Sequence, residues 1–282
     1  MEKFHYKDNR KIFHENRKGD VLYLTFPLIE ETNVVRHGFS TRIGGVSQGI
    51  YASMNLSFQR GDDEHDVREN FKRIAAAIGV KEEEITFSKQ THTANVREVS
   101  LEDKGKGLTK QMDYDNADGL VTNVPGICLA TFYADCVPLF FVDPKKRAIG
   151  LSHSGWRGTV EKIGKRTVEK MSQLYGSRPE DIYAAVGPSI CQDCYEVTGD
   201  VIEGFQKNFR EEYWKELFYK KENGRYQLNL WKANEFVLRE AGVLEEHLEV
   251  TNLCTCCNPE LLFSHRASHG KRGNLGAFLQ LK

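Results

Sequence analysis

Three side chains with metal-binding atoms lie in the middle of the chain, close to strand-like segments. His92 and Cys136 each come shortly after such a segment, and His153 ends another just before a glycine-rich turn. Two imidazoles and one thiolate suit zinc, and three protein ligands leave a fourth position for water or substrate. Bound zinc lowers the pKa of its water to about 7 or polarises a substrate atom. From residue types alone, two packed histidines and a small buried cysteine remain the alternative.

The segments around these residues alternate between helix and strand patterns. Apolar residues that recur every three or four positions predict helices, and runs rich in β-branched or aromatic residues predict strands. The mixture indicates an α/β or α+β protein, and we expect the buried strand before Cys136 to turn at Pro138. The predicted helices span 64–78, 160–174, 200–209 and 230–241, and the predicted strands span 34–41, 127–133, 139–142, 148–153, 182–186 and 276–281.

Length and composition favour one compact domain over residues 1–282. The chain is 40% hydrophobic, and no repeat or flexible linker divides it. Its net charge of -1 provides no field that attracts nucleic acid or a membrane, so we expect a small-molecule partner. Asp135 and Pro138 interrupt the most apolar stretch, 127–142, which excludes a membrane span. The first 20 residues contain no apolar signal segment, so we expect a cytoplasmic protein.

The seven cysteines are an odd number, and the cytoplasm keeps thiols reduced. We therefore expect thiols or metal ligands in place of disulfides. Cys191-x-x-Cys194 with Cys254-x-Cys256-Cys257 is a candidate structural zinc site. In our interpretation the two halves do not pair as two CxxC knuckles, and we expect packing thiols at these five positions.

Seven motifs, in a fixed order from about residue 36 to the C-terminus, resemble the YfiH/YlmD family. This family was once labelled multicopper polyphenol oxidase or laccase-domain, and its members are now regarded as purine nucleoside phosphorylases. One departure is that the family's usual CCYEV is DCYEV here, with Cys191 displaced upstream. The motifs are HGFSTRIGGVSQGIYASMNL (37–56), KQTH (89–92), ADGLVT (117–122), ADCVPLFFVD (134–143), HSGWRGT (153–159), GPSICQDCYEV (187–197) and FSHR (263–266).

The resemblance implies a single domain with an αββα layered arrangement, after a variable N-terminal segment of about residues 1–33. It implies zinc held by the histidine of QxH, the cysteine of DCVP and the histidine of HxGWRG, which are His92, Cys136 and His153 here. The implied activities are phosphorolysis of adenosine, inosine and 5'-methylthioadenosine, and deamination of adenosine at the same site. A monomer and a small homo-oligomer are both compatible with the sequence.

These activities require further groups beside the metal. Deamination needs an activated water and a proton donor, and Asp118 and Asp135 are the candidate carboxyls. Phosphorolysis needs an anion site, which arginines and the N–H groups at a helix start can form. Arg42 is the first candidate for this site and Arg157 the second. For each arginine the alternative is a structural role between loops.

Other functions use the same residues. A His2Cys set also resembles a blue-copper site, so copper is an alternative cofactor and a laccase-like oxidase an alternative enzyme. None of the nine histidines, however, forms the His-x-His pair that multicopper oxidases supply. A peptidoglycan-precursor amidase would use the same metal to activate water. A binding module without catalysis is the least favoured, since it has no use for an open coordination position.

Overall fold

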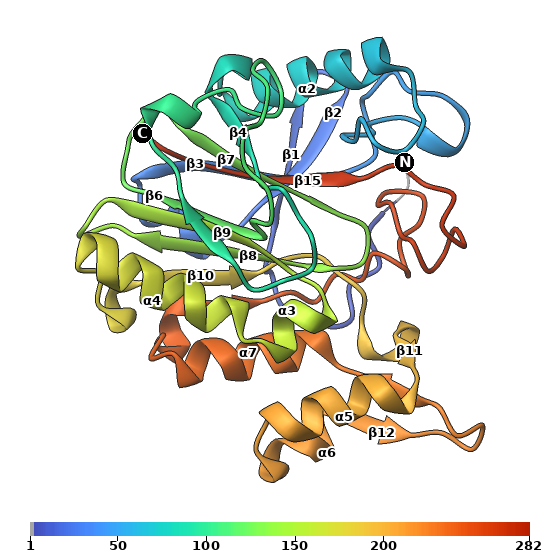
Figure 1. Cartoon of the computed structure of the whole chain (residues 1–282). Helices are drawn as coiled ribbons and strands as arrows, with labels where there is room; N and C mark the ends of the chain where they lie inside the picture. The colour runs from blue at the N-terminus through green and yellow to red at the C-terminus, as the bar shows by residue number, and fades with distance from the viewer. Residues whose placement is uncertain (1–2) are drawn as a thin grey trace.

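Two six-stranded sheets pack face to face in the computed structural model, which describes residues 3–282 (Figure 1). Most strand pairs within the sheets are antiparallel. The first sheet has the order β1 (His14–Lys18), β2 (Val21–Thr25), β3 (Val35–Ser40), β15 (Leu275–Leu281), β7 (Cys128–Tyr133) and β4 (Ile85–Phe87). The second has the order β14 (Leu248–Val250), β10 (Tyr183–Val186), β8 (Val137–Asp143), β9 (Ala148–Ser154), β6 (Gly119–Thr122) and β5 (Val96–Glu98).

Helices lie against both outer faces, and a small third sheet lies to one side (Figure 1). No helix within residues 3–282 has the length and hydrophobicity that a membrane crossing requires. The α-helices are α1 (Pro27–Glu30), α2 (Glu64–Ile78), α3 (Trp156–Val160), α4 (Ile163–Tyr175), α5 (Gly199–Asn208), α6 (Trp214–Leu217) and α7 (Leu230–Glu240). The short 3-10 helices are Gly49–Tyr51, Glu82–Glu84, Leu101–Asp103, Pro179–Asp181, Gln192–Cys194, Glu211–Tyr213 and Glu245–His247. The third sheet has the order β11 (Glu196–Val197), β13 (Tyr226–Leu228) and β12 (Phe218–Lys220).

Each central strand is apolar on both faces because one face meets the other sheet and the opposite face meets helices. On β7, Leu129 packs between the sheets while Ala130 packs with residues of α2. On β8, Phe140 packs between the sheets while Phe141 packs with residues of α4 and α7. Successive side chains of a strand point to opposite faces, so each of these strands packs against the other sheet on one face and against helices on the other. The result is the helix–sheet–sheet–helix order that the family resemblance implies.

The sequence patterns predict the main elements correctly. The predicted helix 64–78 is α2, which begins after Asp63, whose side chain accepts a hydrogen bond from the N–H of His65 at 2.8 Å. It ends at Gly79 in the left-handed conformation, at φ 83°. The three other predicted helices and the six predicted strands are also present, with ends displaced by a few residues.

Two details differ from the predictions. The turn after β7 occupies residues 134–136, and Pro138 lies inside β8, not at the turn. Its missing N–H is tolerated because the pairing of β8 with β10 begins only at Leu139, while the Pro138 carbonyl accepts from the N–H of Gly187 at 2.8 Å. The predicted strands also omit β1 and β2, a hairpin that extends the first sheet beyond β3. They omit β5, β6 and β14 of the second sheet and the three strands of the third sheet as well.

Candidate active site

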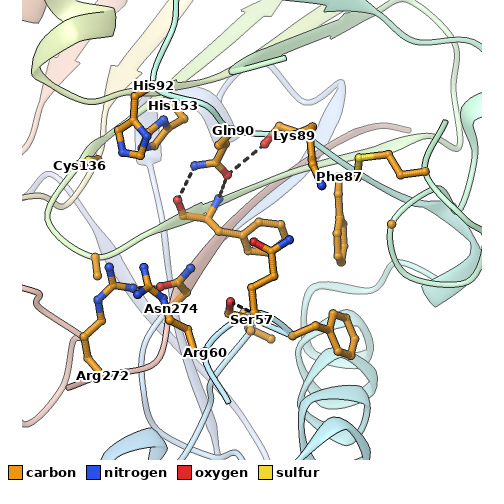
Figure 2. A pocket seen from close by; sticks show the side chains of 18 of the residues that line it. Ser57, Arg60, Phe87, Lys89, Gln90, His92, Cys136, His153, Arg272 and Asn274 are labelled. Carbon is orange, nitrogen blue, oxygen red and sulfur yellow. Dashed lines mark hydrogen bonds between the residues drawn. The ribbon is translucent and has the colours of Figure 1, made fainter. Parts of the chain in front are cut away.

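The side chains of His92, Cys136 and His153 meet at one end of the two sheets (Figure 2). Their ligand atoms all lie within 4.8 Å of one another. His153 is buried, Cys136 is half-buried and His92 is exposed. The three side chains therefore converge as their positions along the sequence predict, and they face a space that one ion can fill.

The strand connections explain this convergence. Cys136 lies in the short link that carries the chain from β7 in the first sheet to β8 in the second. His153 lies on β9, directly opposite Pro138 of β8. His92 follows β4, which pairs with β7. Residues from both sheets are thus brought to the point where the chain crosses between them.

Asp118 orients the two histidines through hydrogen bonds to the backbone of His92 and the ring of His153. It is fully buried, and its Oδ1 accepts from the N–H of His92 at 3.0 Å and from Nδ1 of His153 at 2.8 Å. Its Oδ2 accepts from the N–H groups of Thr91 and Thr93 at 2.9 and 3.0 Å. Because the carboxylate engages Nδ1 of His153, Nε2 is the ring nitrogen that remains to bind a metal once its proton is displaced, and the carboxylate orients the imidazole for this role.

The pKa shifts agree with this arrangement. Burial alone raises the pKa of Asp118, but hydrogen bonds from His153 and from the Thr93 and Thr91 backbone outweigh it and lower the pKa to about 2. Burial also raises the pKa of Cys136, yet His153 and His92 lower it to about 6. For His153, burial lowers the pKa, whereas Cys136 and Asp118 raise it to about 9. At neutral pH Cys136 is therefore a thiolate, the form that binds metals.

A cavity of about 520 Å³ opens beside the three side chains. Phe87 and Phe132 line one part of it and meet edge to face, with ring centroids 4.7 Å apart. Met112 adds a third apolar side chain. These residues give the cavity an apolar wall suited to a flat ring.

Two arginines line the same cavity across from the histidines (Figure 2). Arg272 is 8% exposed, and its guanidinium donates to Asn274 and to the Gly273 carbonyl. Its Nε has no hydrogen-bond partner among the described residues. Burial, and then the charge of Arg60, lower the pKa of Arg272 to about 10. Within residues 3–282 neither arginine forms an ion pair with a carboxylate, although the charges of Asp135 and Cys136 act on Arg272 and offset part of the lowering of its pKa. The arginines therefore leave donors open to an anion in the cavity.

Sequence reasoning missed both arginines. Neither Arg60 nor Arg272 lies within the motifs that carry the family resemblance, and both stand beside a glycine in polar segments. Their common place in the cavity depends on tertiary folding. A local sequence pattern therefore cannot predict that the two arginines lie in the same cavity.

The predicted phosphate-binding arginines lie elsewhere. Arg42 donates to the carbonyls of Ala52 and Pro259 at 2.7 and 2.6 Å, and its guanidinium lies 4.7 Å from the centre of the Phe263 ring. Arg157 is exposed and stacks on its neighbour Trp156. Neither is among the described residues that line the cavity, so their assignment as the anion site stays a prediction without support from the cavity. The contacts of Arg42 fit the structural role that is its alternative.

The two carboxyls predicted as proton donors, Asp118 and Asp135, are both held by hydrogen bonds. Both oxygens of Asp135 are engaged, one by the Thr255 hydroxyl and the other by the N–H of Arg266, each at 2.7 Å. Asp118 accepts six hydrogen bonds and has its pKa lowered to about 2, so it has no proton to give near neutral pH. Neither carboxyl is among the described cavity-lining residues. Their geometry suits positioning and not proton delivery.

Comparison with known proteins gives consistent matches over most of the chain. The family profile described as multi-copper polyphenol oxidoreductase laccase matches residues 36–282. Purine nucleoside phosphorylase YlmD of Bacillus subtilis is 37% identical over 247 residues, covering 87% of this chain and 88% of the relative. A purine nucleoside phosphorylase of Deinococcus radiodurans is 40% identical over 256 residues, covering 90% and 93%.

Solved structures agree with the sequence matches. YlmD from Geobacillus stearothermophilus superposes with a TM-score of 0.88 at 34% identity, covering 96% of this chain and 99% of that one. A hypothetical protein YfiH of Bacillus licheniformis superposes with a TM-score of 0.89 at 33% identity, covering 97% and 100%. Motifs, family profile and fold lead to one conclusion: the chain belongs to the YfiH/YlmD family of laccase-domain proteins.

Proposed function

We propose that this protein is a zinc-dependent purine nucleoside phosphorylase that acts on adenosine, inosine and 5'-methylthioadenosine and also deaminates adenosine. Relatives named purine nucleoside phosphorylase support the reaction class. The single observation that carries the proposal is the cavity, in which two arginines without carboxylate partners face a His2Cys group. A phosphate and a nucleoside require such a pair of sites side by side.

Zinc fits His92, Cys136 and His153 on chemical grounds. Two imidazoles and a thiolate with ligand atoms within 4.8 Å form a three-ligand set, and the adjoining cavity leaves an open position. Asp118 orients His153 as a carboxylate partner commonly orients a metal-binding histidine. When bound, zinc polarises substrate atoms or lowers the pKa of water.

In phosphorolysis, different side chains in and beside the cavity have different roles. Arg272 and Arg60 hold phosphate so that one of its oxygens can attack C1' of the ribose. The bond from C1' to the purine nitrogen breaks and its electron pair stays on the purine. The purine takes up the proton that the phosphate gives up, so the products are purine and ribose 1-phosphate. Phe87 and Phe132 contact the flat base and exclude water from the reacting atoms. Asp118 acts as a positioning residue for His92 and His153.

The alternative functions, a copper-dependent oxidase and an amidase, have less support. The two groups of metal-ligating side chains in the described part of the chain contain only two histidines in total, which is too few for the trinuclear copper centre of a laccase. Copper in place of zinc and an amidase activity use the same three residues, so measurements must separate them. A small-molecule substrate and a cytoplasmic location remain part of the proposal.

Product analysis tests the proposal directly. Purified protein of known metal content is incubated with adenosine, with and without phosphate, and the products are separated by chromatography. We expect adenine and ribose 1-phosphate only when phosphate is present, together with some inosine. Adenine with free ribose, formed equally without phosphate, would contradict phosphorolysis. Turnover of a phenolic substrate or a peptidoglycan-precursor amide, with none of adenosine, would favour the oxidase or the amidase.

A further inference from the structure

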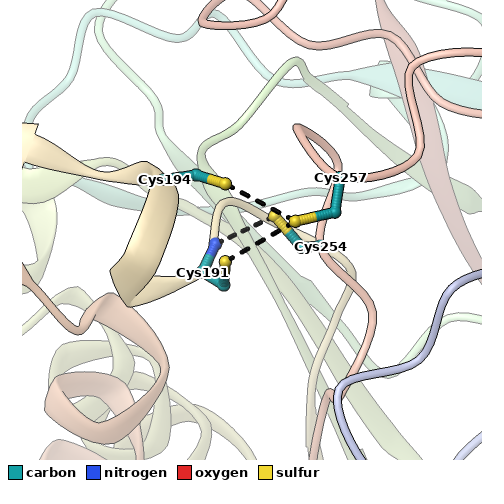
Figure 3. A group of neighbouring side chains, drawn as sticks. All are labelled: Cys191, Cys194, Cys254 and Cys257. Carbon is teal, nitrogen blue, oxygen red and sulfur yellow. Dashed lines mark hydrogen bonds between the residues drawn. The ribbon is translucent and has the colours of Figure 1, made fainter.

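Four cysteine side chains gather outside the cavity (Figure 3). The sulfurs of Cys191, Cys194, Cys254 and Cys257 all lie within 4.8 Å of one another. The Cys257 sulfur is 3.5 Å from that of Cys194 and 4.0 Å from that of Cys191. All four are free thiols, and Cys191 and Cys254 are buried. Four convergent sulfurs are more than packing thiols require.

The four residues form two CxxC pairs that lie side by side. The sequence-based interpretation grouped Cys256 with its neighbours and overlooked the spacing Cys254-x-x-Cys257, which matches Cys191-x-x-Cys194. A parallel bridge between Ser189 and Cys254 joins the two segments. The N–H of Cys191 also points at the Cys254 sulfur, at 3.2 Å. Such a donor stabilises a thiolate in a buried position.

The spacing of the sulfurs suits one tetrahedral ion. With bonds of about 2.3 Å, a zinc ion places its four sulfur ligands about 3.8 Å from one another. Two of the distances between sulfurs, 3.5 and 4.0 Å, lie on either side of this value. An iron–sulfur cluster of several irons separates its cysteines further, because metal and sulfide atoms lie between them.

One cation lies near the group. Lys7 donates to Asp193, which lies between the two cysteines of the first pair, at 3.0 Å and forms an ion pair with it. Since Asp193 already matches the charge of Lys7, this lysine offsets only a small part of the negative charge that four thiolates would have in excess of one divalent ion.

We propose that Cys191, Cys194, Cys254 and Cys257 bind a structural zinc ion, distinct from the proposed ion at the cavity. All four coordination positions are filled by protein, so this site has no place for substrate. It joins two loops that hold the turn before Cys136: Thr255, inside the second pair, donates to Asp135, while Arg266 donates to Asp135 and to the Cys194 carbonyl.

Metal counting on Cys136→Ser tests the proposal without relying on activity. This variant lacks a ligand of the cavity group, so we expect it to retain about one zinc per chain, with X-ray absorption showing four sulfur neighbours at about 2.3 Å. Wild type should contain one zinc more. If wild type and variant have the same single zinc, the cavity zinc of the proposed function fails while the four-cysteine site stands.

Two neighbouring cysteines provide a matched pair of variants. Cys257→Ala should lose the four-sulfur zinc, whereas Cys256→Ala, one residue earlier and outside the group, should keep it. The proposal is overturned if Cys136→Ser contains no zinc, if its metal is iron, or if nitrogen and oxygen neighbours replace sulfur. A disulfide among the four cysteines in freshly purified protein would also overturn it. If Cys257→Ala does not fold, the X-ray absorption spectrum of Cys136→Ser still shows whether zinc is bound by four sulfurs.

Discussion

The two groups of metal-ligating side chains lie close together in the fold but differ in their surroundings. His92, Cys136 and His153 supply three ligands at the edge of a cavity of about 520 Å³. The four cysteines supply four ligands inside paired loops. Open coordination beside a cavity permits chemistry, whereas closed coordination leaves only a contribution to stability. We therefore propose different roles for the two groups: catalysis for the first and stabilisation of the fold for the second.

The link between the two groups is Asp135, which directly precedes Cys136. Its carboxylate accepts from Thr255 and Arg266, and its carbonyl accepts from the N–H of Ile190 at 3.0 Å. We call His92, Cys136 and His153 the open group and the four cysteines the closed group. The loops of the closed group therefore hold the backbone next to Cys136 of the open group. Substitutions in the open group should therefore mainly lower the turnover rate. Substitutions in the closed group should mainly lower the stability of the fold.

The largest expected effect is the loss of activity in Cys136→Ala. Without its thiolate the cavity group keeps two imidazoles, so metal binding and the several kcal/mol of transition-state stabilisation it supplies should disappear. We expect turnover of adenosine to fall by about a thousandfold or more, while the melting temperature changes by only a few degrees. Turnover and thermal unfolding measured on the same preparation check this. Retained turnover in metal-free variant protein would remove the metal from the mechanism.

Cys254→Ser should show the opposite pattern. A structural zinc contributes folding energy directly, so the variant should lose several kcal/mol of stability. Since 1 kcal/mol corresponds to roughly 2–4 °C in large domains, we expect Tm to fall by about 10 °C or more. At a temperature where the variant stays folded, its activity should remain within about tenfold of wild type. An unchanged Tm would show that the four cysteines carry no structural ion.

Asp118→Asn should weaken the open group without removing a ligand. The asparagine NH2 would face backbone N–H donors where Oδ1 or Oδ2 now accepts, so His92 and His153 would lose their orientation. We expect a loss of about 10- to 100-fold in zinc affinity or activity. Added zinc should restore much of the activity, which would not happen if Asp118 only supported the fold. Zinc titration followed by activity assays makes this distinction.

Arg272→Ala should separate the two activities of the cavity. A buried charge-assisted contact with phosphate is worth about 1.5–3 kcal/mol, so phosphorolysis should fall by about 10- to 100-fold, mainly through the KM for phosphate. Deamination uses water as nucleophile and should fall less, which raises the ratio of inosine to adenine. Arg42→Ala is the matched control, because Arg42 contacts carbonyls outside the cavity. A larger phosphate effect in Arg42→Ala would return the anion site to that residue.

The smallest effect concerns the pH dependence of thiol reactivity in metal-stripped protein. The pKa of Cys136 is about 6, because His153 and His92 outweigh the raising effect of burial. Its alkylation rate should therefore stay constant above this pH and fall as the pH drops below it. Burial raises the pKa of Cys256, so that thiol should react only at higher pH. Mass spectrometry of alkylated peptides from about pH 4 to about pH 11, a range that extends well above the ordinary thiol pKa of about 8.5, checks both. A common midpoint for both thiols would contradict the thiolate assignment.

Much of the fold follows from patterns visible in the sequence. The helix from Glu64 to Ile78 has a periodic apolar face, a capping aspartate and a terminal glycine, so its ends are locally encoded. The central strands carry continuous apolar runs because both faces are covered. The hairpin of β1 and β2 was missed because charged residues fill its exposed strand β1 and hide the strand pattern.

The site was predictable to the extent that it depends on chemically rare residues. His92, Cys136 and His153 stand out by type and by their place near strand ends. Arg60 and Arg272 do not, since many arginines occur in polar loops and only tertiary packing brings these two to one cavity. The candidate roles of Asp118 and Asp135 required knowledge of their hydrogen-bond partners. Those partners lie up to 131 residues away in the chain.

An anomalous-scattering map at the zinc absorption edge, from crystals of active wild-type protein, is the most direct test of the central contrast between an open and a closed site. We predict two peaks in each chain. One should lie among His92, Cys136 and His153, within about 2.0–2.3 Å of their ligand atoms, and the other among the four cysteine sulfurs. Absence of the first peak from crystals whose protein still phosphorolyses adenosine would contradict the assignment of the open site as the catalytic metal centre.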